Sequence, residues 1–281
     1  MPTKREEKAE EKKVEMEAEE VEERASPRGQ IVYEAVHKEG EHELERSNSA
    51  LAWSGLAAGL SMGFSLLSEA ILQSHLPDTP WRPLIAKFGY CIGFLVVVLG
   101  RQQLFTENTL TVILPLLRKR DLRTFCNVVR LWAIVLASNL VGAFLIALLI
   151  GKTTAVDAPI HQAMRELGYA SMGHGFGTLI LRGILAGWLI ALMVWLLPFA
   201  ETARVWVIII ITYIVGLGNF SHIVAGSVDG FYLVVIGAKS FPEYLSYMAP
   251  ILLGKIIGGS TIVATFAHAE HIASGEGGER R

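Results

Sequence analysis

Long apolar segments alternate with short polar connections along the chain, and two of the apolar segments are interrupted in the middle. The first of them, 89–117, stays apolar only from Gly89 to Gly100 and then meets Arg101-Gln102-Gln103. At ~1.5 Å per residue, that piece covers little more than half of a ~30 Å hydrocarbon core. Because the apolar pattern resumes at Thr109, we expect two half-helices joined by irregular backbone, which membranes tolerate only inside protein or beside a polar cavity.

The second interrupted segment, 205–237, breaks at Asn219-Phe220-Ser221-His222. Each interrupted segment lies between two intact ones, so the pattern of three spans occurs twice. An odd number of spans per half inverts the second half, and paired broken helices indicate a transport site. The sequence therefore predicts an all-α membrane protein with six transmembrane helices in an inverted 3+3 repeat. The four intact segments are 50–72, 125–150, 176–197 and 247–266.

Composition indicates a membrane-embedded domain that follows a charged N-terminal segment. Hydrophobic residues make up 52% of the chain and charged residues 19%, which is too apolar for an average soluble domain. Residues 1–46 hold 15 acidic and 9 basic residues, a net charge of −6, and the rest carries +4. Without a basic stripe, nucleic-acid binding is not expected. We expect a charged, disordered cytoplasmic extension (1–28), an amphipathic helix at the membrane surface or a soluble tail helix (29–48), a channel domain (49–267) and a cytoplasmic tail (268–281).

Basic residues predict the orientation of the spans. A cluster at 118–123 and Arg204 fall on the side shared with both termini, whereas the opposite connections carry fewer basic residues and no cluster. Cytoplasmic connections are enriched in Lys and Arg. Both termini are therefore expected in the cytoplasm.

The breaks are expected to present helix ends to the membrane centre. Thr106 or Asn108 could cap a half-helix beginning at Thr109, and the second break would do the same for a half-helix beginning near Ser227. Two positive helix ends facing each other at the midplane would attract an anion. The alternative is that the threonine and the asparagine only satisfy backbone groups freed by the kink.

His222 and two phenylalanines are the strongest pore candidates. An ionisable side chain within an apolar segment is usually functional, and an imidazole can pass a proton to a weak-acid anion. A structural histidine bonded to the first break is the alternative. Phe105 and Phe220 each precede a polar residue at what the sequence suggests are matching places, where they could form hydrophobic constrictions. Ordinary aromatic packing would give the same pattern.

Charges near the breaks need partners or water, because charge is costly in a membrane. Arg101 and Glu107 flank the first break and could pair, and Asp229 follows the second. Arg182 and Glu69 lie nearer the ends of spans, where an interfacial position is expected. The chain has no HExxH, GxSxG or GxxxxGK[ST] motif, so we expect no enzyme activity, cofactor or metal.

These features together resemble the formate/nitrite transporter family. The likeness covers about 31–266 and rests on Leu104-Phe105-Thr106, Phe220-x-His222 and the run 253–259 (LGKIIGG). It implies an aquaporin-like protomer in a homopentamer of the bacterial inner membrane, with one pore per protomer. Each pore would pass a small monovalent anion such as formate or nitrite, with a proton, between hydrophobic constrictions. The resemblance implies that Thr106 is the threonine of the first break and His222 the central histidine. With these two, we expect the pore to be lined by Leu104, Phe105, Asn108, Phe220 and Ser221.

The chain departs from the family pattern around the histidine. Gln103 and Ser221 stand where acidic residues are usual, and Gly226, Gly187 and Lys255 stand where asparagines are common. A loop lysine that assists anion capture in many members has no obvious counterpart. These departures bear on the substrate more than on the fold. Two further readings are an aquaporin-like pore for a small neutral solute and a non-conducting scaffold whose charged extension recruits a cytoplasmic partner.

Overall fold

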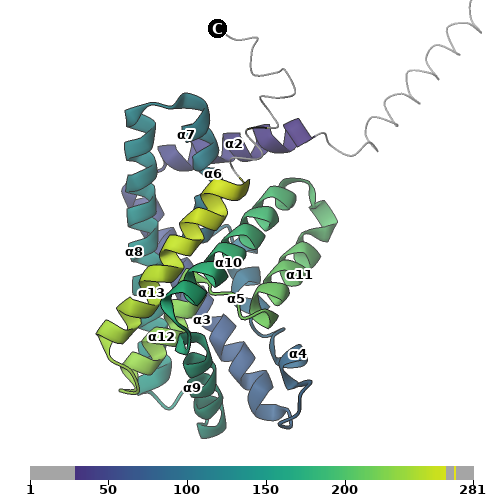
Figure 1. Ribbon diagram of the computed structural model, residues 1–281, viewed down its shortest axis with the longest axis vertical. Coiled ribbons are helices and arrows are strands. Elements are labelled where there is room, and N and C mark those ends of the chain that lie inside the picture. Colours follow the sequence, from purple (N-terminus) through teal and green to yellow (C-terminus); the bar gives the residue numbers. More distant parts are fainter. Residues whose placement is uncertain (1–28, 264–268, 270–281) are drawn as a thin grey trace, which may run out of the picture.

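The computed structural model describes residues 29–263 and residue 269, and its regular structure is helical. Four stretches of this part are long and apolar enough to cross a membrane, which fits a membrane protein. They are α3 (Asn48–His75), residues 82–99, α8 (Leu122–Lys152) and residues 176–199. The last of these stretches begins with α10 (Phe176–Leu196). Figure 1 shows α2 (Gly29–Glu45) lying across one end of the bundle, with α4 (Arg82–Ala86) and α9 (Ala158–Met172) at the opposite end.

Both interrupted segments are broken in the structure. The first consists of α4, α5 (Cys91–Leu99), α6 (Phe105–Thr111) and α7 (Ile113–Lys119), with the break at 100–104. The second consists of α11 (Arg204–Leu217) and α12 (Ile223–Val235), with the break at 218–222. Short 3-10 turns η1 (Leu197–Phe199) and η2 (Glu201–Ala203) link α10 to α11. The last segment is α13 (Phe241–Ile256), continued by a π-helical turn, η3 (Ile257–Val263).

The helices before the two breaks end in the same way. Arg101 has φ 48° and Asn219 has φ 50°, the left-handed conformation that commonly terminates a helix. The next N–H groups, those of Gln102 and Phe220, each donate to the carbonyl five residues back at 3.0 Å. This bond is the Schellman motif, and it turns the chain out of the helix at the same point in both halves.

The common helix end sets the register between the two breaks. Counted from it, Gln102 matches Phe220, and Leu104 matches His222 as the residue before the next helix. Phe105 is already the first residue of α6, whereas Phe220 lies within its break. The interpretation that Phe105 and Phe220 occupy matching places is therefore wrong, because residue type suggested a register that the helix ends do not share.

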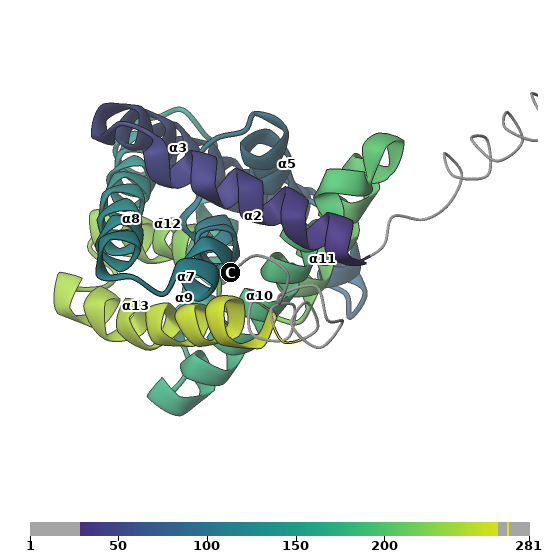
Figure 2. The same ribbon diagram turned by 90° about the horizontal axis from the view of Figure 1, so that it is seen from above.

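Glycines bring the outer helices of each half into backbone contact. A Cβ atom on Gly59 of α3 would lie 2.2 Å from the carbonyl oxygen of Asn139 on α8, and one on Gly258 of η3 would lie 2.2 Å from that of Ile184 on α10. Figure 2 shows α3 beside α8 and α10 beside α13. Such close contact suits a membrane, where burial against lipid gives no hydrophobic gain and helices associate through van der Waals packing.

Helix α9 (Ala158–Met172) lies between the apolar segments 125–150 and 176–197, in a connection that hydropathy does not mark as a span. Asp157 precedes it and Pro159 occupies its first turn, which suits a helix start. Ala163, Met164 and Gly168 are buried where α9 packs against α3 and α12. At the other end, α2 buries one face that includes Tyr33. Both helices cover ends of the bundle without spanning it.

Candidate functional site

The two breaks meet at a hydrogen bond between Thr106 and His222. Thr106 is the second residue of α6, and its Oγ1 lies 3.0 Å from Nε2 of His222, which immediately precedes α12. Thr106 is 0% exposed and His222 is 2% exposed. Because two polar side chains buried this deeply need partners, the pair also fixes how the two half-helices sit against each other.

His222 also caps its own helix. Its Nδ1 accepts a hydrogen bond from the N–H of Ala225 at 3.2 Å, so α12 begins at Ile223 and not near Ser227, as expected from the sequence. An accepting Nδ1 carries no proton, which leaves the proton of the neutral ring on Nε2. His222 then donates to the oxygen of Thr106. The hydroxyl hydrogen of Thr106 remains available for another acceptor.

Asn139 of α8 holds the first break. Its Oδ1 accepts from the N–H of Phe105 at 2.9 Å, and its Nδ2 donates to the carbonyls of Gly55 at 2.7 Å and Gln103 at 2.9 Å. The side chain is 0% exposed. A residue from a neighbouring helix thus supplies the capping bond that the sequence assigned to the break itself. An asparagine within an otherwise apolar span was the available signal.

Asn108 does not cap a helix. It lies inside α6, where its Nδ2 donates to Oε1 of Gln103 at 2.9 Å. The expectation that Thr106 or Asn108 caps a half-helix starting at Thr109 is wrong, because α6 starts at Phe105. Asn108 instead ties the start of α6 to the loop before it.

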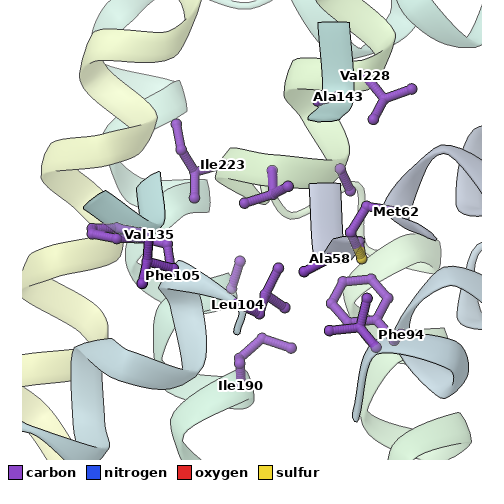
Figure 3. Close-up of a cluster of buried hydrophobic side chains, with 14 of the residues drawn as sticks. Ala58, Met62, Phe94, Leu104, Phe105, Val135, Ala143, Ile190, Ile223 and Val228 are labelled. Carbon is purple, nitrogen blue, oxygen red and sulfur yellow. The ribbon is translucent and has the colours of Figure 1, made fainter. Parts of the chain in front are cut away.

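Apolar side chains surround the polar pair. The ring of Phe94 meets that of His222 edge-on, with centroids 4.8 Å apart, and Phe105 packs in the same manner on Trp132 at 5.8 Å. Leu104 is 1% exposed and lies between Phe105 and Phe94 in Figure 3. Phe94 was not singled out from the sequence, since nothing within its uniformly apolar run distinguishes it. Aromatic and aliphatic groups at a polar site strip water from an entering ion.

A cavity of about 220 Å³ leads from the end of the bundle bearing α4 and α9 to His222. It has room for about seven waters at ~30 Å³ each. The second break supplies part of its wall through Asn219, Phe220 and Ser221. The site is thus reached from this end through a vestibule, the name we use for this cavity.

Four charged side chains line the vestibule. Lys87 Nζ lies 2.6 Å from Oε1 of Glu69, and Ser171 donates to Oδ2 of Asp229 at 2.6 Å. Arg182 is the fourth. Glu69 is 4% exposed, and Arg182 lines the vestibule as well. The interfacial position expected for these two residues stays a prediction.

Arg101 and Glu107 lie away from the vestibule. The guanidinium of Arg101 is 79% exposed and approaches Glu39 of α2 at 4.0 Å. Glu107 interacts electrostatically with Glu39 and Glu43 of the same helix. The predicted Arg101–Glu107 pair is wrong, because the left-handed turn at Arg101 directs its side chain outward. Both residues face α2.

Lys255 of α13 is buried at 0% exposure. Its Nζ donates to the carbonyl of Ala186 on α10 at 3.0 Å. Lys255 therefore ties α13 to α10 through its buried amino group.

Half-helices that meet at a buried polar pair, with a vestibule leading to it, define a channel-like membrane protein. Residues 30–269 match the family model described as "Formate/nitrite transporter", and the chain belongs to this family. It is 38% identical to the inner membrane protein YfdC of Escherichia coli (strain K12) over 94% of this chain and 84% of that protein.

Two solved structures share the fold. One, titled "FNT family ion channel", aligns with a TM-score of 0.74 and 18% identity over 86% of this chain and 99% of that one. The other, titled "Pentameric formate channel with formate bound", aligns with a TM-score of 0.65 and 19% identity over 84% and 98%. At these identities the likeness concerns the fold alone.

Proposed function

We propose that the protein is a channel or proton-coupled transporter for a small monovalent weak-acid anion of the formate or nitrite kind. The observation that carries the proposal is the buried Thr106–His222 hydrogen bond at 3.0 Å, which leaves the threonine hydroxyl free to donate. A small anion needs such donors once its water is removed. Family membership and a structural neighbour titled as a formate channel support the same substrate class.

Each group has a role in this mechanism. Phe94, Leu104, Phe105 and Phe220 form the apolar walls that dehydrate the anion. Thr106 then donates its hydroxyl hydrogen to an anion oxygen. His222 stabilises the threonine oxygen through Nε2–H and can exchange a proton with the passing acid. Ser221 lines the approach, and Asn108 holds the loop in place.

We infer a homopentamer in a bacterial inner membrane, with one six-span inverted-repeat pore per protomer. Both termini are placed in the cytoplasm. The basic end of α7 supports this orientation, because Arg118 binds Glu34 of α2 at 3.0 Å and so lies at the end of the bundle that α2 covers. Within the chain, 29–48 would lie at the membrane surface and 49–267 would form the channel. The extension 1–28 and all of the tail 268–281 except residue 269 lie outside the described residues.

Flux in liposomes tests the proposal. Purified protein should carry formate and nitrite with accompanying proton movement, measured with labelled substrate and an internal pH dye. His222→Asn should change the pH dependence of the flux. Deleting 1–28 should leave the flux unchanged, whereas a scaffold that recruits a partner would lose its role. Solute-driven reswelling without charge or proton movement would indicate a pore for a neutral solute instead, and absence of flux for every short anion would exclude the proposal.

A further inference from the structure

One face of α12 connects His222 to a carboxylate. His222, Ala225, Gly226 and Asp229 recur at i, i+3, i+4 and i+7, and all four line the vestibule. Residues at this spacing lie above one another on a helix, and seven residues span ~10 Å along its axis. Between the polar residues, Gly226 is covered by the hydroxyl of Tyr247, so this stretch of the wall also carries a polar group. A solute that moves along the vestibule to His222 therefore passes Asp229.

Asp229 presents its carboxyl group to the vestibule with a hydroxyl partner. Ser171 of α9 donates its hydroxyl to Oδ2 at 2.6 Å. Within 29–263, Asp229 has no ion-pair partner within 4 Å, unlike Glu69.

Among the described residues, the charged side chains of the vestibule wall do not form an ion pair with the carboxyl group of Asp229. Glu69 of α3 is paired with Lys87 at 2.6 Å, which leaves Arg182 of α10 as the remaining fixed cation of the vestibule wall. The other titratable groups of this wall, besides His222 on the same helix, are phenols. They are Tyr90 and Tyr247.

We propose that Asp229 is a specificity-determining residue, a charge filter that repels permanent anions and admits weak acids, which can pass it in their protonated form. The inference rests on the proposed function and narrows its substrate class. Nitrate or chloride stays charged beside the carboxylate, whereas formate can bind a proton before it passes and release the same proton afterwards. The charge of Asp229 and that of an anion at His222 would lie ~10 Å apart. At an effective dielectric constant of ~20, their repulsion is enough to change the rate of anion passage roughly tenfold.

Paired fluxes of formate and nitrate in liposomes test this role. Asp229→Asn retains an oxygen that accepts from Ser171 but removes the charge. We expect nitrate flux to rise roughly tenfold while formate flux changes less than about threefold. Asp229→Glu, which keeps the charge, and Asp157→Asn, at an exposed aspartate before α9, should behave as wild type. In the wild type, nitrate flux should rise on acidification, and Asp229→Asn should flatten that rise.

The outcomes separate the two proposals. Formate flux in the wild type with an unchanged nitrate-to-formate ratio in Asp229→Asn overturns the filter alone. Missing formate flux in the wild type overturns the proposed function as well. If Asp229→Asn does not elute as a folded oligomer, Asp229→Ser carries the same expectation.

Discussion

Asn139 and Lys255 each donate a hydrogen bond to a backbone carbonyl of the helix packed against their own. Asn139 on α8 donates to the carbonyl of Gly55 on α3 at 2.7 Å, and Lys255 on α13 donates to that of Ala186 on α10 at 3.0 Å. An amide can also accept, and Asn139 uses its oxygen to cap α6. The ammonium group of a lysine cannot accept a hydrogen bond. The capping acceptor of α12 is instead the side chain of His222.

Asn139→Ala should destabilise the protein strongly. The substitution leaves a buried N–H and two buried carbonyls without their side-chain partner, at about 1–3 kcal/mol for each unsatisfied group. We expect a clearly lower thermal unfolding midpoint in detergent and loss of flux. Asn127→Ala on the same helix is the control, since no side-chain hydrogen bond of Asn127 occurs within 29–263. Equal midpoints for the two variants would contradict the assigned role.

Lys255→Met should separate stability from transport. Burying a charge is costly, so an apolar replacement should leave the unfolding midpoint unchanged or raise it. Formate flux should fall roughly tenfold, which is the expected effect of removing a positive charge that acts on the anion. Lys152→Met, at an exposed lysine, should have no effect on flux. Unchanged flux in Lys255→Met would show that its charge does not act on the anion.

The Lys87–Glu69 pair should behave as a buried ion pair. Its side chains are only 15% and 5% exposed. Lys87→Met leaves the carboxylate without its cation and should cost about 3–5 kcal/mol in unfolding free energy. Lys87→Met combined with Glu69→Leu should recover most of that loss. A double variant as unstable as the single one would mean that the pair contributes through packing alone.

Docking of α2 should weaken as the pH falls. Burial lowers the pKa of His37 below its usual 6.5, an effect that the Glu41 carboxylate opposes only in part. A released α2 would bind a proton more readily, so the docked state is fully favoured above about pH 6.5 and loses stability as the pH falls through the lowered pKa. Hydrogen exchange of residues 29–45, corrected for intrinsic rates, should be faster at pH 5.5 than at 7.5. His37→Gln should remove the difference, and exposed His42→Gln should keep it.

Hydropathy alone located the breaks, because a span that stops halfway is visible in the residue pattern. The ends of α8 and α10 lie within a few residues of the expected segments. Helix α9 was missed because its buried face is carried by a few small or flexible residues such as Ala163 and Met164. A pattern that weak looks like a loop.

The candidate site was only partly predictable. Thr106 and His222 stood out as polar residues in apolar segments, and the structure brings them together. The capping bonds come from Asn139 and from His222 itself, which depends on how helices distant in sequence pack. The ion pair of Glu69 was not predictable for the same reason, since its partner Lys87 comes from the next segment.

The most direct test of the central claim is the formate flux of Thr106→Val in liposomes. Valine matches threonine in shape but removes the hydroxyl that is free to donate to the anion. We predict a loss of flux of at least about tenfold relative to wild type in protein that still elutes as a folded oligomer, with a lower unfolding midpoint because the Nε2–H of His222 loses its acceptor. Thr111→Val, the same change at another buried position of α6, should retain the flux. Wild-type flux in Thr106→Val would contradict a substrate site at the Thr106–His222 pair.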